Sequence, residues 1–296
     1  MIALSAHLIS IRAALMAVGS ERLAVLLSRA YREVAEIAVA TEGQILPLDA
    51  RGLSIIWGES DGLPQDAIGK VEAVWDLLGR MEVLRERFLR EEGLPMSPRF
   101  GIAMTNESSR ERGRSRVEEG PESVIDRAHL LQRAGLFYQS PVLLDDTSAR
   151  VGSVHMQIRE IDRLTGDGDA LLFSPEARKV TMLSLEEVHA YQGACEAVHE
   201  LMGPRGRVSP DRMGAAMAMQ GALELYRQGE WNKAAAVLTL LASDASPNPL
   251  AHIYLERCRA KTGGTPARDF LSPKLQMHIQ SGDGRPPLSA PDDRAA

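Results

Sequence analysis

The order of predicted strands and helices in the first half of the chain limits its fold more than any other feature. An apolar run at residues 2–11 predicts a buried strand, and residues 21–40 follow with apolar side chains at helical spacing. The stretch ILPLDARGLSIIWG, residues 45–58, is typical of a hairpin because turn residues separate two β-prone runs. A second amphipathic helix is predicted at residues 64–92, and a strand, RFGIAMT, at residues 99–105. This β-α-β-β-α-β order predicts an α+β fold, with a sheet covered by helices.

A charged segment and three further strands follow. Residues 106–120 are dominated by polar and charged side chains and predict an exposed loop. Residues 122–136 have helical periodicity, and residues 140–146 and 154–164 predict two strands. A Gly-Asp-Gly turn predicts that residues 168–174 form the third strand and pair with the second.

The pattern becomes helical in the last third of the chain. Residues 185–202 predict a helix, residues 203–211 a Gly/Pro-rich linker, and residues 212–262 a helical block. The tail, residues 263–296, is rich in Gly, Pro, Ser and charge, which predicts disorder.

Composition narrows the class of protein. The net charge of −6 gives no general attraction to nucleic acid. Two isolated cysteines, Cys195 and Cys258, favour neither a disulfide framework nor a zinc site and are typical of a reducing cytoplasm. The N-terminus lacks the charge pattern and cleavage site of a signal peptide, and no uncharged run reaches transmembrane length, so we expect a cytoplasmic protein without membrane insertion.

Six short stretches together resemble the catalytic domain of the class III nucleotidyl cyclases, which are adenylate and guanylate cyclases. In chain order they are ALSAHLISIR, EGQILPLDARGLSIIWG, RFGIAMT, VIDRAHLLQRA, VLLDDTS and IREIDRL. The resemblance covers about residues 1–182. It implies a cyclase-homology domain there, with a ferredoxin-like, βαββαβ-derived sheet covered by helices.

The resemblance also implies that the two metal positions of the family are occupied here by His7 and Arg51. The family holds two divalent ions between two aspartates at these places, and hard cations need carboxylate oxygen. Arg51 is a permanent cation that repels Mg²⁺. His7 has two interpretations, a metal ligand or a satisfied core residue, and Arg51 either binds an anion or is simply solvated.

The other working positions of the family fall on Pro47, Gly120, His129 and Arg133. Pro47 and Gly120 replace the pair that reads the purine base, and His129 replaces the asparagine that acts in the transition state. Arg133 retains the arginine that clamps the phosphate, although a surface or structural role is the alternative. Because most of the chemistry is replaced, we expect no catalytic, substrate-binding or metal site, and no cofactor.

The helical block contains ALELYRQGEWNKAAAVLTLL, which resembles a tetratricopeptide hairpin broken at Gly229, followed by YLERC. Many bacterial cyclases end in a similar segment. The expected division is therefore a cyclase-homology domain at 1–182, a helix and linker at 183–211, the tetratricopeptide-like segment at 212–262, and the disordered tail. A single such hairpin either caps the domain or binds a protein partner.

Three functions remain open. The first is an inactive regulatory or interaction component in signal transduction, which forms a homodimer or a heterodimer with an active cyclase. The second is a divergent nucleotide cyclase that uses Mg²⁺ or Mn²⁺ with a partner. The third is a relic of a longer signalling protein. An apolar face of the second long helix, with Val83, Leu84, Phe88 and Leu89, is the expected dimer surface. The alternative is that Phe88 and Leu89 pack under the C-terminal helices.

Overall fold

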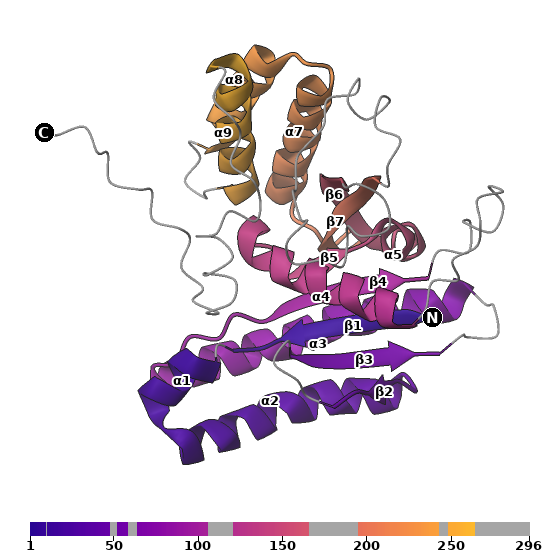
Figure 1. The fold of residues 1–296 in the computed structure, drawn as a ribbon, viewed down its shortest axis with the longest axis vertical. Coiled ribbons are helices and arrows are strands. Elements are labelled where there is room, and N and C mark those ends of the chain that lie inside the picture. Colours follow the sequence, from indigo (N-terminus) through magenta and orange to yellow (C-terminus); the bar gives the residue numbers. More distant parts are fainter. Residues whose placement is uncertain are drawn as a thin grey trace, which may run out of the picture.

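A seven-stranded sheet lies at the centre of the computed structural model, which describes residues 1–9, 11–47, 52–58, 64–105, 121–165, 195–242 and 248–263 (Figure 1). The strands are β1 (Ile2–His7), β2 (Gln44–Ile45), β3 (Leu53–Trp57), β4 (Arg99–Met104), β5 (Val142–Leu144), β6 (Met156–Thr165) and β7 (Cys195–Pro204). The helices are α1 (Ile11–Val18), α2 (Ser20–Ala40), α3 (Pro64–Glu92), α4 (Pro121–Tyr138), α5 (Asp146–Gly152), α7 (Pro210–Arg227), α8 (Trp231–Ala242) and α9 (Pro249–Gly263).

The first four strands have the expected ferredoxin-like order. The sheet runs β2-β3-β1-β4-β5-β7-β6, and the pairs β2–β3, β3–β1 and β1–β4 are all antiparallel. Leu4 of β1 lies opposite Ile55 on one side and Ile102 on the other. This is the split βαβ arrangement, in which the first strand takes the centre and the hairpin strand inserts beside it. The predicted α+β class and the predicted hairpin are confirmed.

Helices α2 and α3 cover one face of the sheet; in Figure 1 α3 runs behind the strands and α2 lies below them. Leu23, Leu26, Ala30 and Val34 are buried on α2, at the spacing of one helical face. They share a core with the side chains of β1 that point the same way, and the alternate residues of β1 point to the opposite face. The predicted amphipathic stripe of this helix is confirmed.

Helix α4 covers the opposite face and lies very close to it. A Cβ atom on Gly101 of β4 would be 2.0 Å from the Ala128 carbonyl oxygen and 2.4 Å from the Gln132 amide nitrogen. Only glycine leaves room for this approach. Helices α7, α8 and α9 complete the apolar cluster on this side, and they lie above α4 in Figure 1.

One predicted element is wrong. Residues 195–204 form β7, which pairs with β6 over its whole length, whereas a helix was predicted at residues 185–202. The sheet therefore extends beyond residue 182, the predicted end of the first domain. Residues 168–174, predicted as the partner of β6, lie outside the described residues.

The two short helices were not predicted. The strand expected at residues 2–11 ends at His7, and α1 begins at Ile11. Helix α5 begins directly after Asp145, whose carboxylate accepts a hydrogen bond from the Ser148 amide at 2.8 Å and so caps the helix.

The helical block comprises α7, α8 and α9. Gly229, with φ of 77°, separates α7 from α8 at the expected break. Tyr226, Ala234, Leu238 and Tyr254 are buried between these helices and the sheet. The assignment as a tetratricopeptide-like segment stays a prediction. No helix in the described part of the chain is long and apolar enough to cross a bilayer.

One expectation about α3 needs correction. Phe88 was predicted on the exposed dimer face, but only 1% of it is exposed and it belongs to the core under α2. Val83 and Leu89 are exposed as expected. Trp75 of α3 is partly buried and packs at the core margin.

Candidate functional site

A row of polar residues lies on the α4 face of the sheet, where the predicted site residues of β1 and α4 meet. In β1, Leu4 and Ala6 point into the core under α2, so Ser5 and His7 point toward α4. Ser5 is fully buried and His7 is partly buried. The arrangement follows from strand alternation alone.

His129 is held by two hydroxyl groups of the sheet. Its Nδ1 lies 2.6 Å from Ser5 Oγ of β1, and its Nε2 lies 3.3 Å from Ser54 Oγ of β3. The imidazole is buried, with 5% exposed. Because both ring nitrogens are hydrogen bonded inside the protein, the ring links α4 to two strands and does not face an open cleft.

His7 lies opposite Arg99 in the β1–β4 pairing. Burial and the nearby Arg99 charge lower the pKa of His7 to about 4, so the imidazole is neutral at pH 7. Burial also lowers the pKa of Arg99, to about 10, and the guanidinium remains charged. A divalent cation beside His7 would therefore meet a positive charge and no carboxylate from this strand pair.

Arg133 lies one helical turn after His129 on α4 and is partly buried. Desolvation lowers its pKa, and the side chain still carries its charge at neutral pH. Its position on α4 places it near the polar row but not within the hydrogen bonds that hold His129.

The remaining predicted site residues are not brought together with these. Pro47 is exposed just beyond β2, and β2 is separated from β1 by β3. Because neighbouring strands are spaced at about 5 Å, β2 and β1 are roughly 10 Å apart. Arg51 and Gly120 lie outside the described residues. Within the described ranges, no group of three or more His, Cys, Asp or Glu side chains is placed to hold a metal ion.

A buried carboxylate at Asp145 was missed by the sequence analysis. It accepts hydrogen bonds from the Met104 amide at 2.9 Å and from Arg127 Nε at 3.0 Å, in addition to capping α5. Arg127 also donates to the Met104 carbonyl. The cluster fixes the end of β4 against α4. Asp145 followed by Ser148 is an N-cap pattern that could have been read from the sequence.

A second buried carboxylate, Asp162 of β6, was also missed. It accepts hydrogen bonds from Tyr138 at 2.5 Å, from Tyr254 at 3.0 Å and from Arg257 at 2.8 Å. Burial and the Asp162 charge raise the pKa values of both tyrosines well above their usual range, so both remain protonated donors. Tyr254 and Arg257 belong to the YLERC stretch, which therefore anchors α9 to the sheet.

The chain matches no family model and no curated protein. Among solved structures it is similar to the adenylyl cyclase CyaB from P. aeruginosa, with 14% identity and a TM-score of 0.46, over 70% of this chain and 96% of that one. The guanylyl cyclase Cya2 gives 11% identity and a TM-score of 0.45, over 70% and 95% of the two chains. A bacterial light-regulated adenylyl cyclase gives 9% and 0.45, over 77% of this chain and 56% of that one. At these values the likeness carries no argument about activity, so function has to be argued from the residues themselves.

Proposed function

We propose that this chain is a catalytically inactive relative of the class III nucleotidyl cyclases that acts as a regulatory or interaction component in intracellular signalling. The observation that carries the proposal is the replacement of both metal carboxylates of the family, by His7 and Arg51. The six matching stretches and the ferredoxin-like strand order support the relationship.

The surroundings of His7 and His129 support the loss of catalysis. Metal-assisted phosphoryl chemistry depends on positioning and on charge stabilisation of the triphosphate. His7 is a neutral imidazole beside the Arg99 cation, and the pair offers no carboxylate oxygen to a Mg²⁺ ion. His129 is buried and engaged with Ser5 and Ser54, so it is not poised to contact a nucleotide.

The direct test is turnover by the purified full chain. Incubated with ATP or GTP and with Mg²⁺ or Mn²⁺, it should form no cyclic nucleotide above a heat-killed control. The double variant His7→Asp, Arg51→Asp restores both carboxylates but leaves Pro47 and His129 in place, so it should remain inactive. Cyclic nucleotide that is formed by the wild type and lost in Arg133→Ala would overturn the proposal.

The second candidate function is a divergent cyclase that is active only as a heterodimer. The observation that favours it is Arg133, which keeps the residue type of the phosphate clamp and its charge. In this reading the partner chain supplies the metal carboxylates and the base-reading residues, with Mg²⁺ or Mn²⁺ as cofactor. Addition of the chain to an active cyclase should then raise turnover, and Arg133→Ala should remove the increase.

Association through the exposed side of α3 is part of the proposal. Val83 is 68% and Leu89 is 54% exposed, and both lie on this helix. Sedimentation of the full chain should show a dimer that Val83→Glu and Leu89→Glu weaken. The full chain is needed because a fragment that ends at residue 182 would lack β7. A monomer at tens of micromolar would exclude self-association of useful affinity.

A cytoplasmic location and a protein partner at α7–α9 are also part of the proposal, and they rest on the sequence evidence alone.

A further inference from the structure

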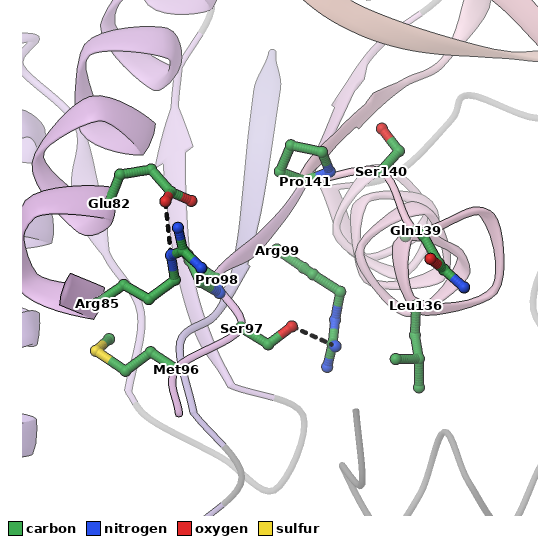
Figure 2. Close-up of a pocket in the computed structure, with 11 residues that line it drawn as sticks. Glu82, Arg85, Met96, Ser97, Pro98, Arg99, Leu136, Gln139, Ser140 and Pro141 are labelled. Atoms are coloured by element: carbon green, nitrogen blue, oxygen red, sulfur yellow. Dashed lines mark hydrogen bonds and ion pairs between the residues drawn. The ribbon is translucent and has the colours of Figure 1, made fainter. Parts of the chain in front are cut away.

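A pocket of about 380 Å³ opens where β4 begins, between the C-terminal half of α3 and the last turn of α4 (Figure 2). Met96, Leu136 and Pro141 give it apolar walls, and Ser97 and Gln139 add polar groups. Its size is within the range of small-molecule sites, and polar and apolar side chains both line it. It is separate from the hydroxyl groups that hold His129.

Arg99 is the unusual residue of this pocket. It is the first residue of β4, and only 5% of it is exposed. One guanidinium nitrogen donates to Ser97 Oγ at 3.3 Å, but Nε is buried without a hydrogen-bond partner among the described residues. Within the same residues no carboxylate forms an ion pair with Arg99. A buried charge without a partner is costly, and a bound anion would offset that cost.

The neighbouring groups leave this charge uncompensated. Arg85 and Glu82 both line the pocket, but they pair with each other at 2.6 Å, as the dashed line in Figure 2 shows. His7, the residue opposite Arg99, is neutral at pH 7. Gly135 of α4 packs beside the arginine stem: an added Cβ atom would be in ordinary contact with Arg99 Cδ at 3.5 Å, but only 2.7 Å from the Ser140 carbonyl oxygen.

We propose that this pocket binds a small organic carboxylate, with its oxygens on the Arg99 guanidinium and its carbon skeleton against Leu136 and Met96. The planar guanidinium matches the two oxygens of a carboxylate better than a point charge does. The apolar walls give an organic anion an advantage over inorganic phosphate, which shares the oxyanion but has no carbon skeleton. The site is independent of the function proposed above, and its test requires no nucleotide turnover.

Calorimetric titration of the full chain tests the chemistry of the ligand. The probe is benzoate, and the comparisons are benzamide, which has the same shape without the charge, and inorganic phosphate at equal ionic strength. Benzoate should bind with saturation, benzamide should not bind, and phosphate should bind at least tenfold more weakly. Equal binding of benzoate and benzamide would contradict the role of the charge. Equal binding of benzoate and phosphate would contradict the carboxylate assignment.

Variants test the position. Arg99→Lys should weaken benzoate binding at least tenfold, and Arg99→Gln should abolish it. The matched control is Arg80→Gln, which removes one positive charge from the exposed side of α3, where Arg80 pairs with Glu33 and Glu36, and should leave binding unchanged. Leu136→Glu keeps Arg99 and supplies a competing carboxylate within the pocket, so it should also abolish binding. A folded Arg99→Gln or Leu136→Glu protein that binds benzoate like the wild type would overturn the proposal.

Discussion

Arg257 of α9 and Asp162 of β6 form a fully buried ion pair at 2.8 Å across 95 residues of sequence. Asp162 has no exposed surface, and Arg257 also lies over the Tyr254 ring, 4.8 Å from its centroid. The pair joins the helical block to the sheet.

Removal of either partner of this ion pair should be strongly destabilising. Asp162→Asn leaves the Arg257 charge without an anionic partner in a dry interior, and Arg257→Met leaves the Asp162 charge without a cationic one. Either change should lower the free energy of unfolding by about 3–5 kcal/mol. Asp162→Asn combined with Arg257→Met removes both charges and keeps an amide oxygen as acceptor for the Tyr138 and Tyr254 hydroxyls, so it should cost less than the sum of the two single changes. Denaturation in urea measures all three. Purely additive effects would show that the two side chains are not coupled.

Tyr254 should stabilise an irregular point in β6. Strand β6 has a register shift between Glu160 and Asp162 that leaves Ile161 outside the regular pairing, and the Tyr254 hydroxyl lies 2.9 Å from the Ile161 carbonyl oxygen. Tyr254→Phe should therefore lower the free energy of unfolding by about 1–3 kcal/mol. Tyr31→Phe on α2 is the matched control and should have little effect. Equal losses from the two variants would argue against a special role for Tyr254.

Local sequence signals predicted most of the first half of the fold. The hairpin pairs Gln44–Ile45 with Leu53–Trp57, and its turn is close in sequence, so its pattern was readable. Strand β7 could not be predicted from its local sequence. Its stretch CEAVHELM is rich in good helix formers, and its pairing with β6 is set by tertiary structure, which overrides local propensity.

The site could be predicted only in part, for a related reason. The motif placed His129 in the helix, but the chain gives no sign that Ser5 and Ser54 meet its two ring nitrogens. Nor does the sequence show that Arg99 lacks a carboxylate partner in the described part of the chain. Such facts depend on which side chains three separate elements bring together, and they appear only after the sheet is assembled.

Stability should fall between pH 6.5 and pH 4 because of His7. Its pKa is 6.5 in the unfolded chain and about 4 in the fold, so the unfolded state takes up the proton first as the pH falls. The contribution of the neutral His7 to the free energy of unfolding is complete above pH 6.5. It is lost as the pH falls to 4, and the total loss is about 3 kcal/mol. Denaturation curves across this range measure it.

The variant that isolates this effect is His7→Gln, which should flatten the wild-type slope between those pH values. His252→Gln on the exposed side of α9 is the matched control and should leave the slope unchanged. Identical slopes for wild type and His7→Gln would mean that His7 is accessible to protons in the folded state.

Two glycine-to-alanine changes should have opposite effects. Gly101→Ala would place a methyl group 2.0 Å from the Ala128 carbonyl oxygen, so α4 must move away from β4, and we expect a loss above about 3 kcal/mol or failure to fold. Gly79 lies within α3 with nothing within 4 Å of an added Cβ. Gly79→Ala should therefore stabilise the protein by about 0.5–1 kcal/mol, because alanine restricts the unfolded chain and favours the helix. Thermal unfolding distinguishes the two, and a neutral Gly101→Ala would contradict the close packing of α4 on the sheet.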